Sequence, residues 1–289
     1  MSTTVATSVV ILGSLALLFG ILIAVASKTL RVWEDPRIDT VAGMLPGNNC
    51  GACGQAGCRA FAEYVVGGAI QPSQCTVMDA DGVTAVAAYL GVDAGAVNKR
   101  IARLLCGGGS DLAVRHADYR GLQTCAAAAA VAGGGKGCAW ACLGLADCER
   151  ACSFNAIFMN GRDLPTVIPS LCTACGDCVE ACPKELFTLM PVEQKLIVQC
   201  RSLLEGAAAD ALCAAACNGC GRCAADGAPG LIRMRNGLAV IDYSSNALAA
   251  PSATRRCPTG AIAWVDGIQF THTRGDAGAV EDVYEAARA

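Results

Sequence analysis

Hydrophobic and polar positions divide the chain into one long apolar segment and many short ones. Residues 5–26 (VATSVVILGSLALLFGILIAVA) are uncharged and long enough to cross a bilayer as a helix. Lys28 and Arg31 follow at once and no basic residue precedes the run. The positive-inside rule therefore predicts a single-pass anchor in the cell (inner) membrane, with the rest of the chain on the cytoplasmic side. A cleaved signal peptide is the alternative, because residues 24–26 (AVA) resemble a cleavage site, but a basic leader segment is missing.

Beyond the anchor, the pattern predicts short elements. Residues 28–45 are expected to be a linker, and 81–137 a helical connecting region. Within that region, 84–105 have helix-forming composition, with a break near Gly91 and Asp93 as a candidate N-cap. The run CAAAAAVAGGGKGC that ends at Cys138 predicts a helix of small residues that stops at its glycines.

A pattern of one cysteine-rich loop and one short apolar strand recurs four times after residue 138. The segments CVEACPKELFTLM (178–190) and RRCPTGAIAWVDG (255–267) both carry a final cysteine, a proline and a strand. In CERACSFNAIFMNG (148–161), Ser153 replaces the proline, and CAADGAPGLIRMRNG (223–237) lacks the final cysteine. Four such units predict two ferredoxin-like modules in tandem.

The predicted fold class is therefore α+β, with an N-terminal transmembrane helix over 1–27. A small 4Fe–4S domain is expected over 46–80, and ferredoxin-like modules over 138–195 and 196–270, the second of them degenerate. The remaining residues, 271–289, are expected to be a surface helix or a frayed tail.

Composition favours metal centres over a conventional core. The chain has 20 cysteines in 289 residues, while only 16% of its residues are charged and 5% aromatic. Because cytoplasmic thiols stay reduced, this density indicates metal or redox centres and not disulfides. The net charge of −3 gives no support to nucleic-acid binding.

The first cysteine group predicts a separate 4Fe–4S site. Cys50, Cys53, Cys58 and Cys75 are its four candidate ligands. Glycines between them let the backbone approach the sulfurs and turn N–H groups toward a negative cluster.

In the first module, the run CTACGDCVEACP is typical of bacterial two-cluster ferredoxins, in which the fourth cysteine of each run ligates the other cluster. That rule gives one cluster with Cys152, Cys172, Cys175 and Cys178. It gives a second, from the stretched run CAWACLGLADCERAC, with Cys138, Cys142, Cys148 and Cys182. Zinc is the alternative for such thiol pairs.

In the second module, the same rule leaves one complete ligand set: Cys217, Cys220, Cys223 and Cys257. The other set is absent as a whole, because its four positions carry Gly227, Ala247, Ala250 and Ala253. We therefore expect one cluster in this module.

Four cysteines are left over: Cys106, Cys125, Cys200 and Cys213. They are interpreted either as structural thiols, since free cysteine packs as a small apolar residue, or as ligands of one more cluster. The sequence thus predicts four 4Fe–4S clusters, or five.

The amino-terminal helix, the segment PGNNCGACGQAGCRAFAE with Cys75, and the ferredoxin repeats together resemble the B subunit of the Rnf complex, an ion-translocating ferredoxin:NAD+ oxidoreductase. The runs DYRGLQTCAAAA and CLGLADCERAC are similar to the long form of that protein. The resemblance implies an electron-transfer subunit that accepts electrons from soluble ferredoxin and relays them to membrane partners. It also implies that flavin and nicotinamide sites lie in other subunits.

No general acid, base or nucleophile is expected, because neither His116 nor His272 lies in a recognisable catalytic setting. Candidate landing surfaces for an acidic ferredoxin are the basic segment 99–103, the pair Arg115 and Arg120, or the pair Arg255 and Arg256. The alternatives are a relay subunit of a hydrogenase-linked or formate-linked complex and a membrane-anchored zinc-binding interaction protein.

Overall fold

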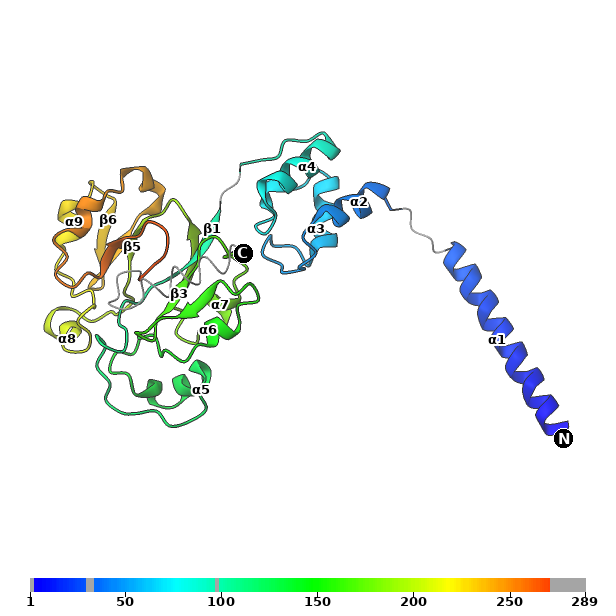
Figure 1. Cartoon of the computed structure of the whole chain (residues 1–289), viewed down its shortest axis with the longest axis horizontal. Helices are drawn as coiled ribbons and strands as arrows, with labels where there is room; N and C mark the ends of the chain where they lie inside the picture. Colours follow the sequence, from blue (N-terminus) through cyan, green and yellow to red (C-terminus); the bar gives the residue numbers. More distant parts are fainter. Residues whose placement is uncertain (1–2, 30–33, 97–98, 271–289) are drawn as a thin grey trace.

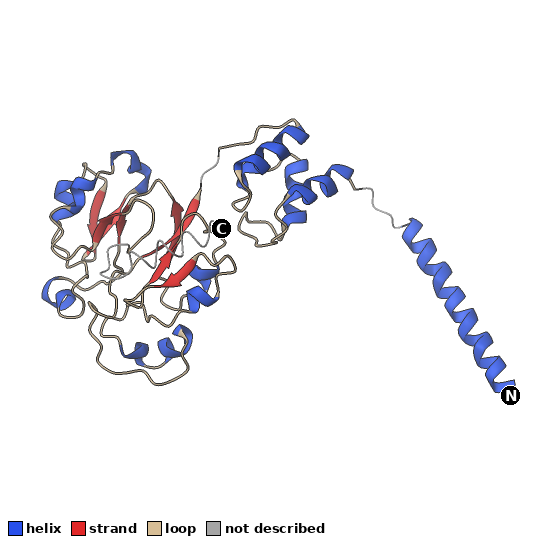
Figure 2. Cartoon of the chain, viewed as in Figure 1, coloured by secondary structure: helices blue, strands red, loops and turns tan. Residues whose placement is uncertain are grey.

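The computed structural model describes residues 3–29, 34–96 and 99–270, and Figures 1 and 2 show their elements. Helix α1 (Thr3–Thr29) contains a stretch, Thr7–Thr29, with a mean hydropathy of 2.9 and with none of its hydrophobic window buried inside the protein. It is long and apolar enough to cross a membrane, as the sequence predicts. The expected tail and His272 lie outside the described residues.

A small helical domain follows. Its elements are α2 (Pro36–Met44), α3 (Cys58–Val66), the 3-10 helix η1 (Pro72–Gln74) and α4 (Ala80–Leu90). Helix α2 lies in the range expected to be a linker, and Asp35 caps it by accepting the Arg37 N–H at 2.9 Å. Val41 on α2 packs with Phe61 on α3 and Val86 on α4 in one buried cluster. An apolar stripe at helical spacing therefore makes α2 part of this domain.

The expected helix over 84–105 is wrong beyond Gly91. This glycine ends α4 with a left-handed backbone (φ 67°), and Asp93 caps no helix among the described residues. Residues Arg100–Leu104 instead form strand β1, which pairs antiparallel with β4 (Phe187–Pro191) of the first ferredoxin-like module. The strand conformation of this segment depends on pairing with residues far along the chain, and local composition does not reveal such partners.

The first module consists of β1, β4 and the elements between them. These are α5 (Cys125–Ala130), η2 (Ala132–Gly135), α6 (Asp147–Arg150), β2 (Ile157–Met159), β3 (Pro165–Val167) and α7 (Asp177–Glu180). Strands β2 and β3 form a hairpin with Ile157 opposite Val167. The run expected to be a helix of small residues is α5, which stops before the glycines.

The second module repeats this plan. Its elements are β5 (Leu196–Val198), α8 (Gly206–Asp210), α9 (Arg222–Asp226), β6 (Ile232–Arg235), β7 (Leu238–Ile241), η3 (Tyr243–Leu248), η4 (Pro251–Thr254) and β8 (Ile262–Trp264). The strand that enters the module, β5, pairs antiparallel with its last strand, β8, just as β1 pairs with β4. Strands β6 and β7 form the hairpin between them. Two similar modules thus lie side by side in the part of Figure 1 that follows the small domain.

Candidate metal centres

Five cavities of about 310–340 Å³ each are lined by four cysteines, and together they include all twenty cysteines of the chain. The quartets are Cys50, Cys53, Cys58 and Cys75; Cys152, Cys172, Cys175 and Cys178; Cys125, Cys142, Cys148 and Cys182; Cys217, Cys220, Cys223 and Cys257; and Cys106, Cys138, Cys200 and Cys213. None of the cysteines forms a disulfide.

In the small domain, the four expected cysteines surround one cavity, and the buried side chain of Phe61 also lines it. Cys58 is the first residue of α3, and its N–H donates to Asn49 Oδ1 at 2.9 Å. Asn49 and Gly51 both have left-handed backbones (φ 47° and 69°), which turn the loop around the cavity. Glycine adopts this conformation without strain.

In the first module, two quartets are interleaved as the crossover rule predicts. The Ala156 N–H donates to Cys152 Sγ at 3.3 Å, and the Leu186 N–H donates to Cys182 Sγ at 3.4 Å. Each donor lies four residues after its cysteine, so the two repeats share one local geometry. Backbone donors of this kind stabilise a thiolate.

The structure differs from the expected grouping at Cys138. The fourth cysteine around the cavity of Cys142, Cys148 and Cys182 is Cys125, the first residue of α5, and Cys138 lines another cavity. The reason is a tertiary hydrogen bond. The Ala126 N–H donates to Asp147 Oδ2 at 3.0 Å, which brings the start of α5 beside Cys148.

In the second module, the four expected cysteines surround one cavity. Of the four positions of the missing set, Ala253 is only 1% exposed and belongs to the main buried cluster of this module, whereas Ala247 is exposed. Gly227 follows α9, and a side chain there would meet Ile232 and the Cys223 carbonyl at 3.1 Å. At Ala253 and Gly227, apolar packing therefore leaves no room for the sulfurs of a second ligand set.

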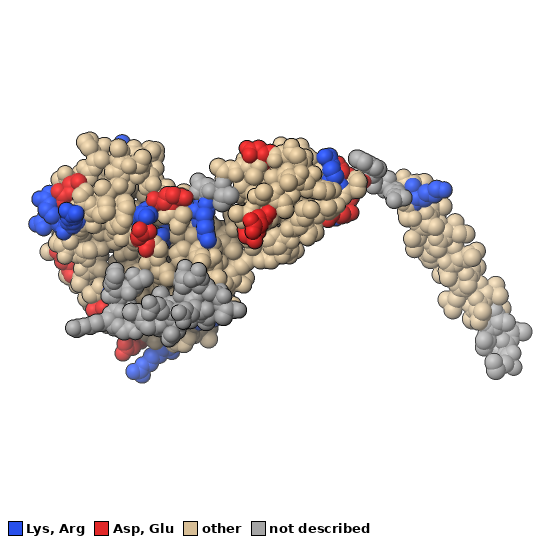
Figure 3. All heavy atoms as spheres, turned by 45° about the horizontal axis from the view of Figure 1, so that its top comes forward, with Lys and Arg blue, Asp and Glu red and all other residues tan. Residues whose placement is uncertain are grey.

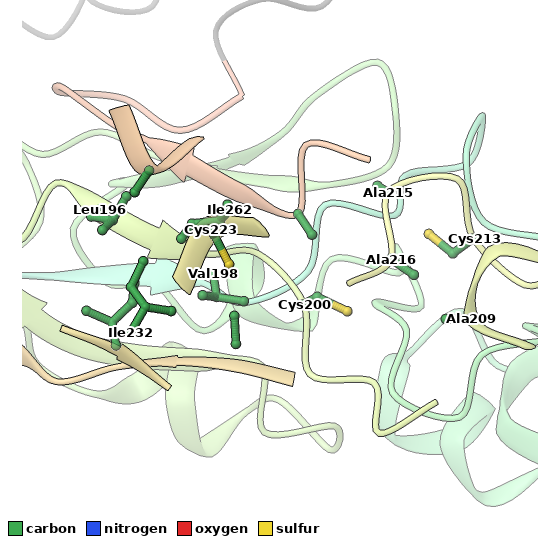
Figure 4. Packing of buried hydrophobic residues seen from close by; sticks show 14 of the residues in the cluster. Leu196, Val198, Cys200, Ala209, Cys213, Ala215, Ala216, Cys223, Ile232 and Ile262 are labelled. Atoms are coloured by element: carbon green, nitrogen blue, oxygen red, sulfur yellow. The ribbon is translucent and has the colours of Figure 1, made fainter. Parts of the chain in front are cut away.

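The fifth cavity gathers three of the four leftover cysteines, with Cys138 as the fourth. Cys106 follows β1, Cys200 follows β5, and Cys213 follows α8, so the cavity lies between the two modules. Figure 4 shows Cys200 and Cys213 on neighbouring segments, with the Cys200 sulfur on the side of its segment that faces Cys213. No local spacing connects these cysteines, so the sequence leaves Cys106, Cys200 and Cys213 open between structural thiols and a further cluster and assigns Cys138 to another site.

Burial raises the pKa of thiols in these cavities. It raises the pKa of Cys106 to about 11, that of Cys148 to about 12 and that of Cys223 to about 11, and neighbouring thiolates add to the effect. Four such groups can be ionised together only if positive charge lies between them, which iron supplies. Among the described residues, no group of three or more His, Cys, Asp or Glu could hold a single metal ion. The quartets instead surround cavities, and this arrangement fits a polynuclear cluster.

The charges around the cavities also differ from expectation at one place. Arg103, in the basic segment 99–103 that is one candidate landing surface, is only 1% exposed. Its Nη1 donates to the Gly267 carbonyl at 2.7 Å, whereas Nε and Nη2 have no partner in the described part of the chain. Burial lowers the pKa of this guanidinium to about 10. Arg103 therefore cannot form part of a landing surface.

Comparison with known proteins agrees with this arrangement. An Fe-S cluster family matches residues 45–77, and a family described as a 4Fe-4S binding domain matches residues 165–187. These ranges cover the small-domain cavity and part of the first module.

Individual relatives extend the match to most of the chain. The chain is 41% identical over 81% of its length to the B subunit of the Na(+)-translocating ferredoxin:NAD(+) oxidoreductase complex of Acetobacterium woodii, covering 70% of that protein. It is 37% identical over 90% to the B subunit of the proton-translocating ferredoxin:NAD(+) oxidoreductase complex of Clostridium ljungdahlii, covering 92% of it. It is 35% identical over 91% to the B subunit of an ion-translocating oxidoreductase complex of Methanosarcina acetivorans, covering 99%. The chain therefore belongs to the B subunits of Rnf-type ion-translocating oxidoreductase complexes, and it is an iron–sulfur electron-transfer protein of the 4Fe–4S type.

Proposed function

We propose that this chain takes electrons from reduced ferredoxin and passes them to membrane-bound partner subunits of a ferredoxin:NAD+ oxidoreductase. The observation that carries the proposal is the recurrence of cavities lined by four cysteines through every described domain after α1. When bound, 4Fe–4S clusters supply one-electron redox chemistry at these places. The chain contributes the ligands, their burial and the hydrogen bonds that tune the sulfurs.

Four quartets are the ligand sets of this proposal. They are Cys50, Cys53, Cys58 and Cys75; Cys152, Cys172, Cys175 and Cys178; Cys125, Cys142, Cys148 and Cys182; and Cys217, Cys220, Cys223 and Cys257. Cys148 and Cys178 belong to different quartets of the first module, and they are near enough for one thiolate to raise the pKa of the other, after the larger effect of burial. The two centres of this module are therefore neighbours.

The cluster-bearing domains belong on the cytoplasmic side in this proposal. Lys28 is the basic residue in the last turn of α1, and no charged residue precedes it. Basic residues that flank a membrane helix are retained in the cytoplasm. Soluble ferredoxin is found in the same compartment under this arrangement.

The second module offers the best landing surface for ferredoxin. Cys220 is the one exposed cysteine of the twenty, all of which the structure describes. Segment 217–260 contains five arginines but only two aspartates, although the whole chain has a net charge of −3. Figure 3 shows Lys and Arg gathered at the end of the molecule where α9 and β6 lie. Exposed basic charge beside an accessible centre favours an acidic electron carrier.

Three arginines lie within two residues of cysteines that line the Cys220 cavity, and we call them the arginine collar: Arg222, Arg255 and Arg256. Arg222 lies two residues after Cys220, and Arg256 immediately precedes Cys257. Arg256 is paired with Asp226, whereas Arg222 and Arg255 form no ion pair among the described residues. Their charges are thus available to a docking partner.

Anaerobic purification of the full chain tests the proposal. Four occupied sites require about 16 iron atoms and as many acid-labile sulfides per chain, with a brown absorbance that bleaches when reduced ferredoxin is added. A colourless chain that contains zinc and no sulfide would overturn the proposal. A brown chain that dithionite reduces but ferredoxin does not would overturn the ferredoxin step.

A further inference from the structure

We propose that Cys106, Cys138, Cys200 and Cys213 hold a fifth 4Fe–4S cluster at the junction of the two ferredoxin-like modules. The inference starts from the likeness of this cavity to the other four. Its volume is about 330 Å³, and four cysteines line it together with small residues such as Gly107, Ala215 and Ala216. The four cysteines come from four separate segments, so their convergence is a property of the tertiary fold.

The four thiols face one another across this cavity. After the larger effect of burial, Cys213 and Cys200 raise the pKa of Cys106, and Cys138 raises that of both Cys200 and Cys213. Each cysteine is therefore close to two others of the same quartet. Structural thiols scattered in a core would not be arranged in this way.

Backbone hydrogen bonds hold the four segments in place. The Gly107 N–H donates to the Gln199 carbonyl at 2.8 Å, which joins the segment of Cys106 to that of Cys200. The Val114 N–H donates to the Leu212 carbonyl at 2.9 Å, and the Gly137 N–H donates to the Val114 carbonyl at 2.9 Å. Through Val114, the segments of Cys213 and Cys138 are fixed to the same loop.

Gly108 shows how closely the backbone is fitted to this site. A Cβ atom at this position would lie 2.8 Å from Cys213 Sγ and 3.8 Å from Cys106 Sγ. The neighbouring Gly107 has room, because its nearest contacts would be at 3.6–3.7 Å. Neither glycine has a left-handed backbone, so space alone requires the absence of a side chain at position 108.

Contacts of this site with cysteines of both modules indicate that it connects their centres. The Cys142 N–H donates to Cys106 Sγ at 3.5 Å, and Cys142 belongs to a quartet of the first module. On the other side, burial raises the pKa of Cys200, and a hydrogen bond from the backbone N–H of Cys217 lowers it by a smaller amount. Cys217 belongs to the quartet of the second module. The fifth centre therefore lies between a centre of the first module and the centre of the second, where it can pass electrons from one module to the other.

Iron counting in the full chain tests this inference, which rests on the proposed iron–sulfur function. The intact chain should contain about 20 iron atoms. Cys200→Ala should lose about four, and the double variant Cys138→Ala/Cys200→Ala should lose the same four, because both cysteines serve one cluster. Cys125→Ala/Cys200→Ala should lose about eight, because those cysteines serve two. If Cys200→Ala loses no iron, or if Cys138→Ala/Cys200→Ala loses about eight, the inference is wrong. An intact chain without iron would instead overturn the proposed function.

A second pair of variants keeps every cysteine and covers the case in which an alanine variant fails to fold. Gly108→Ala should lower the occupancy of one cluster, measured as about four fewer iron atoms and one fewer reduced-cluster signal by electron paramagnetic resonance. Gly107→Ala is the matched control and should keep full occupancy. Equal and full occupancy in both variants would count against a cluster at this site.

Discussion

The arginine collar makes a quantitative prediction about electron uptake. The double variant Arg222→Glu/Arg255→Glu removes two positive charges beside the exposed Cys220 and adds two negative ones, which changes the net charge of segment 217–260 from +3 to −1. Two unit charges about 10 Å apart in water interact by about 0.4 kcal/mol. A change of four unit charges facing one carboxylate of the carrier amounts to about 1.6 kcal/mol and should therefore slow association about 15-fold at low salt. Near 0.1 M salt, where the Debye length is about 10 Å, the effect should fall to about threefold.

Stopped-flow reduction of the holoprotein by reduced ferredoxin, at several salt concentrations, measures this effect. Arg120→Glu is the control, because Arg120 is also exposed and carries the same charge but lies in the loop before α5. It should leave the rate nearly unchanged. If the collar variant and Arg120→Glu slow uptake equally, the collar is not the landing surface. If uptake by the intact chain does not depend on salt, electrostatic steering is excluded altogether.

Three further predictions concern the sites themselves. Cys257→Ala should remove about four iron atoms. Gly227→Cys alone should add none, because the other three positions of the missing ligand set are alanines. An unchanged iron content in Cys257→Ala would refute the crossover assignment. Asn49→Gly keeps the left-handed backbone but removes the acceptor of the Cys58 N–H. It should therefore destabilise the first site by about 1 kcal/mol and speed the release of iron to a chelator severalfold. A release rate equal to that of the intact chain would contradict this role of Asn49. Phe61→Ala should lower the free energy of unfolding of the small domain by about 3–5 kcal/mol, measured in urea titrations followed by circular dichroism. Phe61→Leu is the milder control. A loss below about 1 kcal/mol in Phe61→Ala would show that this side chain is not a core residue.

The sequence alone determined whatever depends on short spacing. The uncharged run before Lys28 predicts α1, and the loops with two residues between cysteines place Cys172, Cys175 and Cys178 around one cavity. Local geometry is sufficient there, because consecutive turns direct several sulfurs to one point. The missing ligand set around Ala253 is equally visible, since the ferredoxin repeat gives a position for each absent cysteine.

Tertiary structure decided the features that depend on distant partners. Strand β1 forms because β4, more than eighty residues later, offers it hydrogen bonds, and its burial removes Arg103 from the surface. The exchange of Cys138 for Cys125 follows from a hydrogen bond between α5 and Asp147. The cavity between the modules needs four segments to meet, and no residue spacing encodes their distances. Sequence spacing fixes ligands within one loop, whereas long-range hydrogen bonding and burial fix ligands that converge from separate loops.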